Sequence, residues 1–141
     1  MPQIERSRIL TISSVPTQKE GALGIIECEE DIPFEVKRVF FAYDMPKHTI
    51  RGQHANATLK EFVFCLTGSA IVETKNPSNT QTFELATRLE GVYIPPLNWV
   101  TLTADSENTS WVVLASAPYN ANDQLRDFDT YRRLANEQSR E

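Results

Sequence analysis

The sequence predicts an all-β domain, an antiparallel barrel or sandwich followed by a short C-terminal helix. Short runs rich in β-branched and aromatic residues recur up to residue 115, and turn-forming residues separate them. Beyond residue 122 the pattern changes to apolar residues spaced three apart, which is typical of a helix. A length of 141 residues without a repeat or a long linker suits a single domain, residues 1–141, with one core.

The first three expected strands lie at residues 9–12, 24–27 and 36–43. A bend that contains a proline, residues 31–34, precedes the third strand, and a second proline-containing segment, residues 44–46, ends it. The third strand is rich in β-branched and aromatic residues, as strands commonly are.

The next two strands, 59–66 and 69–74, are expected to pair across a tight turn at Gly68. A polar loop at residues 75–79 follows them. The remaining strands are expected at 80–86, 91–94, 99–103 and 110–115.

The expected helix covers residues 122–136. Its apolar stripe consists of Leu125, Phe128, Tyr131 and Leu134, with charged residues between them. Asn120 or Asn122 could cap the helix, and we expect its apolar face to pack on the barrel or on a partner subunit. Residues 138–141 are expected to be frayed.

Charge and cysteine content limit the class of protein. A formal net charge of −5 argues against nonspecific binding of nucleic acid. No run approaches the about 18 apolar residues that a membrane span needs, and the N-terminus lacks the apolar core of a signal peptide. Cys28 and Cys65 are the only cysteines, and Cys65 lies in an apolar run that suits the core. The sequence therefore predicts a cytoplasmic protein without a nucleic-acid or membrane partner.

The most informative motif begins at His54 and resembles the first signature of cupin barrels. One residue separates His54 from Asn56, four more precede Glu61, and six more precede Gly68. In metal-binding cupins a second histidine stands where this chain has Asn56, and Val100 stands where the second motif places a further histidine. Two good ligands rarely hold a transition metal against water, so we predict neither a metal nor another cofactor.

Acid–base chemistry is the alternative to metal chemistry. The imidazole of His54 has an ordinary pKa of about 6.5 and can act as a general base near Glu61 in the mouth of a barrel. Arg51, Asn56 or a backbone N–H could stabilise the enolate oxygen that forms. His48, the other histidine, lies in a loop and is a second candidate for the proton-transfer pair. The candidate catalytic residues are therefore His54, Glu61 and Asn56.

Candidate binding residues come from two sets of side chains. Basic residues around the motif could hold a phosphate group, namely Arg38, Lys47, Arg51 and Lys60. Core or rim aromatics could stack on a nucleotide base or a sugar, namely Phe40, Phe62, Tyr93 and Trp99.

Several segments together resemble one family, the small WxcM-like cupins that act as sugar 3,4-ketoisomerases. The resemblance runs over about residues 20–131. Its landmarks are the segments 31–34, 37–41, 51–55, 65–69, 91–99, 114–119 and 126–129. The family's motif Arg-Gly-x-His-Ala-His is matched up to its first histidine, which is His54, and departs from the pattern at Asn56. Phe40 replaces a common tyrosine, and Glu61 replaces a common glutamine.

The resemblance implies a cupin, that is, a double-stranded β-helix or jelly-roll barrel. It further implies a metal-free isomerase that converts a dTDP-4-keto-6-deoxyglucose, or a related sugar, to its 3-keto isomer for surface-polysaccharide synthesis. A homodimer with an exchanged N-terminal strand is implied as well. Because Asn56 and Val100 depart from the pattern, two alternatives stay open. One is a cupin that binds a nucleotide sugar without turnover, and the other is a cupin with a different sugar-modifying reaction.

Overall fold

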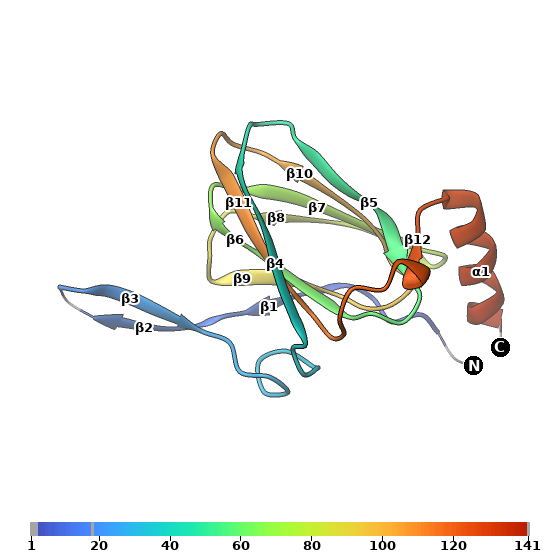
Figure 1. Cartoon of the computed structure of the whole chain (residues 1–141), viewed down its shortest axis with the longest axis horizontal. Coiled ribbons are helices and arrows are strands. Elements are labelled where there is room, and N and C mark those ends of the chain that lie inside the picture. The colour runs from blue at the N-terminus through green and yellow to red at the C-terminus, as the bar shows by residue number, and fades with distance from the viewer. Residues whose placement is uncertain (1–2, 18, 141) are drawn as a thin grey trace.

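The chain folds into two antiparallel sheets that face each other, with a hairpin arm on one side and a helix on the other (Figure 1). We describe a computed structural model, and the structure describes residues 3–17 and 19–140. The first sheet has the order β1 (Arg8–Thr11), β9 (Glu90–Ile94), β6 (Glu61–Thr67), β11 (Thr109–Ala115) and β4 (Arg38–Met45). The second has the order β12 (Gln124–Leu125), β5 (Ile50–Asn56), β10 (Trp99–Ala104), β7 (Ala70–Asn76) and β8 (Asn79–Leu85).

The core lies between the two sheets, which confirms the predicted cupin-type barrel. In β7, β10 and β11 every second side chain is buried, which is the two-residue period of strands with one face inward. The inward residues include Val63, Val72, Val92, Leu102 and Trp111. Cys65 is buried among them, and burial raises the pKa of its thiol to about 11, so it serves as a small core residue as predicted.

A second apolar cluster lies on the outer face of the first sheet. There, Ile32 and Phe34 from the bend before β4 cover Phe62 and Tyr93. The Phe34 and Tyr93 ring centroids are 6.1 Å apart. This cluster holds the segment before β4 against the outer face of the first sheet.

The prediction missed two features of the strand arrangement. A hairpin of β2 (Ser13–Thr17) and β3 (Gly21–Ile25) projects from the barrel, whereas only one strand at 24–27 was expected. In addition, β5 was not predicted, although it carries the His54 motif. Its sequence is polar and contains a glycine, so it lacks the β-branched pattern of a strand.

The helix prediction was wrong at its start. α1 spans Phe128–Arg140, and Asp127 rather than Asn120 or Asn122 caps it. The Asp127 carboxylate accepts hydrogen bonds from the Thr130 N–H (3.0 Å) and hydroxyl (2.6 Å), which hold its pKa below the usual value. Asn120 instead caps a 3₁₀ turn at Ala121–Asp123. Residues 138–140 continue the helix, and Glu141, the last residue of the expected frayed end, lies outside the described residues.

The helix packs on the barrel through a third cluster, as its apolar stripe predicted. Tyr131 and Ala135 lie against Ala55 of β5. The Tyr131 hydroxyl is within hydrogen-bond distance of the carbonyl oxygens of Lys75 (2.8 Å) and Leu97 (2.9 Å). No helix of the described residues is long and apolar enough to cross a membrane.

Candidate active site

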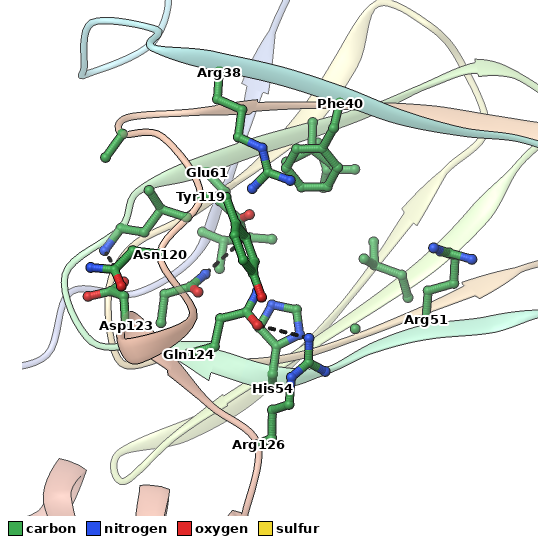
Figure 2. A pocket seen from close by; sticks show the side chains of 18 of the residues that line it. Arg38, Phe40, Arg51, His54, Glu61, Tyr119, Asn120, Asp123, Gln124 and Arg126 are labelled. Carbon is green, nitrogen blue, oxygen red and sulfur yellow. Dashed lines mark hydrogen bonds between the residues drawn. The ribbon is translucent and has the colours of Figure 1, made fainter.

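A cavity of about 500 Å³ lies between the two sheets and is the candidate active site (Figure 2). β4 supplies one wall and β5 the opposite wall, while β6 and β11 carry further lining residues. The segment that follows β11, residues 117–126, borders the cavity and is here called the strap. Of the candidates predicted from the sequence, six line the cavity: Arg38, Phe40, Arg51, His54, Asn56 and Glu61.

A bulge in β5 turns Arg51 and His54 toward the same side of the sheet. His54 pairs with Val100 and Arg51 pairs with Leu102, both of which belong to the buried core between the sheets. The register shifts between these pairs. Gly52 (φ +85°) and Gln53 (φ +57°) have left-handed backbone conformations there. In a regular strand, residues three apart would face opposite sides, so this bulge brings both side chains into the cavity.

His54 sits in the wall of the cavity as a half-buried imidazole. Burial is the main cause that lowers the pKa of His54 below 6.5; the Gly52 backbone opposes this with a smaller effect, and the nearby Arg126 guanidinium lowers the pKa further. Among the described residues, its buried Nδ1 has no hydrogen-bond partner. At neutral pH the side chain is therefore a neutral imidazole that can accept a proton.

Glu61 is the buried acid of the cavity. Its side chain is 6% exposed, and burial raises the pKa of the carboxyl to about 7. Arg38 and the Asn56 amide favour the ionised form, but their effect is smaller than that of burial. The Asn56 Nδ2 donates a hydrogen bond of 3.2 Å to Glu61 Oε1. Glu61 is therefore a carboxyl group that can give up or take a proton near pH 7.

Three arginines give the cavity a positive rim. The Arg38 guanidinium lies between two rings, 4.3 Å from the Phe40 centroid and 5.2 Å from that of Tyr119. Arg51 extends from the β5 bulge, and Arg126 donates a hydrogen bond of 2.8 Å to Gln124 (Figure 2). None of the three forms an ion pair in the described part of the chain, where the pairs involve other residues. They are available to an anionic ligand.

The strap is tied to the loop between β5 and β6 by Asp123. Its carboxylate accepts hydrogen bonds from the Thr58 N–H (3.0 Å), the Thr58 hydroxyl (2.6 Å) and the Leu59 N–H (3.0 Å). The sequence reasoning assigned no role in ligand binding or catalysis to the strap residues that line the cavity, chiefly Tyr119, Asn120, Asp123, Gln124 and Arg126. The available signal was their position: polar and aromatic residues directly after the last long strand, in a segment expected to begin a helix.

Five of the predicted binding residues do not line the cavity: Lys47, Lys60, Phe62, Tyr93 and Trp99. Tyr93 lies between Val92 and Ile94, which face the core, so its ring turns to the outer cluster. Trp99 precedes the inward Val100 and packs against the helix, with its ring centroid 5.1 Å from that of Phe128.

Lys60 precedes the inward Glu61, and its backbone pairs with Ser116. His48 is exposed in the turn between β4 and β5 and does not line the cavity either.

The side chains present do not fit the metal of metal-binding cupins. His54 and Glu61 hold two ligand positions, but Val100 is buried and apolar where a third ligand would be needed. Among the described residues, no three His, Cys, Asp or Glu side chains lie close enough together to hold a metal ion.

Comparisons with known proteins agree on one family. Residues 5–136 match the family described as FdtA: WxcM-like, C-terminal. The TDP-4-oxo-6-deoxy-α-D-glucose-3,4-oxoisomerase of Aneurinibacillus thermoaerophilus is 32% identical over 113 residues, which cover 80% of this chain and 81% of that protein.

Solved structures give the same result. QdtA, a sugar 3,4-ketoisomerase from Thermoanaerobacterium thermosaccharolyticum solved with TDP, has a TM-score of 0.87 and 32% identity over 94% of this chain and 96% of its own. A His-to-Asn variant of QdtA, solved with TDP-4-keto-6-deoxyglucose, has a TM-score of 0.86 and 31% identity over 93% of this chain and 94% of its own. The family match, the curated relative and these structures all show that the chain belongs to the WxcM-like family of cupin-fold sugar 3,4-ketoisomerases.

Proposed function

We propose that the protein is an isomerase that converts a dTDP-linked 4-keto-6-deoxy sugar to its 3-keto isomer. One observation carries the proposal. A neutral imidazole, His54, and a carboxyl with a pKa of about 7, Glu61, line one cavity, and the three arginines at its border form no ion pair with the described residues. The arginines suit the diphosphate of a nucleotide sugar, and the two titrating groups suit proton transfer between adjacent carbons. The same activity in relatives that match nearly the whole chain supports this assignment.

The proposed reaction has two balanced halves. In the first, His54 takes the proton from C3, the C–H electrons form a C3–C4 double bond, and the ketone oxygen at C4 takes a proton from Glu61. In the second, the C3 hydroxyl returns a proton to Glu61 as its oxygen becomes a ketone, and C4 takes the proton from His54. Both side chains end in their starting protonation states, and no other reactant is needed.

The direct test follows product by NMR after incubation with dTDP-4-keto-6-deoxyglucose. We expect the 3-keto isomer to form with the wild type, and at least about 100-fold more slowly with His54→Gln or Glu61→Gln. The Asn120→Ala variant, which changes a cavity residue without a titrating group, serves as the matched control. No product with the wild type over a range of pH would remove the proposal.

A second candidate function is a module that binds a nucleotide sugar without turnover. Asn56 favours it, because an amide stands where the family motif has a histidine and cannot act as a base. The TDP-sugar complex of the His-to-Asn variant of QdtA supports such binding when an amide replaces an imidazole in a relative. For such a module, calorimetry would give the same dissociation constant for the dTDP-sugar with the wild type and with His54→Ala. The NMR experiment would show no 3-keto product.

We also propose a homodimer in which the β2–β3 hairpin crosses to the second copy. Strand β4 is an edge strand, and its outward side chains Val39, Phe41 and Tyr43 are 56%, 63% and 65% exposed. The hairpin that projects from the barrel carries exposed Val15 and Leu23. A second copy would cover these apolar surfaces.

The remaining assignments follow from the proposed reaction. The 3-keto sugar would enter the synthesis of deoxyamino sugars for bacterial surface polysaccharides. The free thiols of Cys28 and Cys65 suit the reducing cytoplasm.

A further inference from the structure

Asn56 has a buried amide oxygen that no group of the described residues satisfies. The side chain lines the cavity and is 5% exposed. Its Nδ2 donates to Glu61 Oε1, and its buried Oδ1 accepts no hydrogen bond from the described residues. A buried acceptor without a donor is costly, and such groups in a binding cavity are usually satisfied by the ligand.

The neighbours of Asn56 fix the orientation of the amide. When Glu61 is ionised, its Oε1 can only accept a hydrogen bond. A flipped amide would place Oδ1 against this acceptor, so the orientation that points Nδ2 at Glu61 is the favourable one. In this orientation one N–H of Nδ2 is engaged by Glu61, and Oδ1 is left without a donor among the described residues.

From this arrangement we infer that Asn56 determines substrate specificity by accepting a hydrogen bond from the sugar hydroxyl beside the ketone. The inference rests on the proposed function for the identity of the sugar. Asn56 lies two residues from His54 on β5 and contacts Glu61, so it faces the part of the sugar where protons move. Of the two reacting positions, the C4 ketone only accepts hydrogen bonds, whereas the C3 hydroxyl can donate one to Oδ1. Asn56 can only accept this hydrogen bond, whereas a histidine at position 56 could also transfer a proton to or from the sugar.

The experiment compares dTDP-4-keto-6-deoxyglucose with its 3-deoxy analogue, which keeps the ketone and lacks the hydroxyl. The analogue's inhibition constant is compared with the KM of the ketosugar. We expect the wild type to bind the analogue about 10-fold or more weakly, since the Asn56 oxygen is left without a donor. In Asn56→Ala the two ligands should bind within about threefold of each other.

Asn120→Ala is the matched control. Asn120 also lines the cavity, but its Oδ1 already accepts a hydrogen bond from the Asn122 N–H at 3.0 Å. This variant should keep the wild-type preference for the hydroxyl. Asn56→Ser, which retains a small acceptor, should keep part of that preference, and it provides a second test if Asn56→Ala folds poorly.

The inference is overturned if the wild type binds both ligands equally, or if Asn56→Ala retains the full preference. Failure of the proposed function is a separate result. If the wild type forms no 3-keto product, calorimetry can measure the dissociation constants of the ketosugar and of its 3-deoxy analogue directly. The ratio of these two constants, in the wild type and in Asn56→Ala, then tests the role of Asn56.

Discussion

His54 and Glu61 have pKa values that burial moves in opposite directions. The pKa of His54 falls below 6.5 and that of Glu61 rises to about 7, so near neutral pH one is a base and the other an acid. His54 can therefore accept a proton from a ligand while Glu61 donates one to it, without a metal ion.

The pH dependence of turnover follows from these shifts. Activity needs neutral His54 and protonated Glu61, so we expect kcat/KM to fall as pH rises through about 7 and Glu61 ionises. It should also fall at acid pH, where His54 takes a proton. Initial rates between pH 5 and 9 at substrate concentrations well below KM measure both decreases. A rate that climbs steadily to pH 9 would show that ionised Glu61 is the active form.

Glu61 should also make stability depend on pH. Its folded-state pKa of about 7 exceeds the ordinary 4.5, so the folded protein binds this proton more tightly than the unfolded chain. The stabilising contribution is complete below pH 4.5 and is lost as pH rises through 7. We therefore expect Glu61→Gln, relative to the wild type, to gain on the order of 2 kcal/mol in free energy of unfolding between pH 5 and pH 8. Urea denaturation at the two pH values measures this change. If the free energies of unfolding of Glu61→Gln and the wild type differed by the same amount at pH 5 and at pH 8, the pKa of Glu61 would not be raised by folding.

The sequence predicted which motif residues share a cavity better than it predicted the side of a strand to which an aromatic side chain points. The spacing of His54, Asn56 and Glu61 was sufficient to place them in one cavity. Tyr93 and Trp99 were not placed correctly by residue type, because a large aromatic suits a ligand and a core equally well. The alternation of each strand decides the direction, and it requires the register.

At the scale of elements, the bulge in β5 explains why the motif contains glycine. A Cβ on Gly52 would lie 3.0 Å from the Val100 carbonyl oxygen, and the residue has a φ of +85°. Gly52 therefore permits the conformation that turns Arg51 and His54 toward one cavity.

Substitutions in the bulge test this account. We expect Gly52→Ala to lower the free energy of unfolding by about 1–3 kcal/mol and to reduce kcat, because the strained backbone shifts His54. Gln53→Val should act similarly, since a branched residue rarely adopts a positive φ, whereas Gln53→Asn should be tolerated. Urea denaturation and initial rates measure both effects. Equal behaviour of the valine and asparagine variants would contradict a role for the backbone conformation.

The late start of α1 shows a limit of periodicity. The spacing of Leu125 and Phe128 fits a helix, yet Leu125 pairs with Ala55 in the short strand β12. The tertiary pairing prevails because the Asp123 carboxylate anchors the strap to the β5–β6 loop before the helix begins. This hydrogen bonding joins residues about 65 positions apart and is not visible in a local pattern.

At the scale of the whole molecule, the barrel was predictable from the sequence, whereas the homodimer that the family resemblance implies stays a prediction. Short apolar strands and the cupin spacing sufficed for the two sheets. The projecting hairpin could not be inferred from local pattern, because its residues are mostly exposed and find few partners within the chain.

The exposed edge of β4 gives a test of the proposed dimer. We expect Phe41→Asp together with Tyr43→Asp to convert a dimer to a monomer, because the charges would be buried against the second copy. Thr82→Asp, at an exposed position of the other edge strand β8, should leave the dimer intact. Light scattering coupled to size-exclusion chromatography measures the mass. A wild-type monomer at micromolar concentration would contradict the proposal.

The central claim is that His54 and Glu61 move a proton between C3 and C4 of a nucleotide-linked ketosugar. Deuterium exchange at C3 of dTDP-4-keto-6-deoxyglucose in deuterated water, followed by NMR, tests it most directly. The account predicts exchange with the wild type that His54→Gln reduces at least about 100-fold, and formation of 3-keto product that Glu61→Gln reduces similarly. Exchange that His54→Gln leaves unchanged would contradict the account. So would the absence of both exchange and 3-keto product in the wild type while the sugar is bound, because His54 can also carry the same proton from C3 to C4 without exchange.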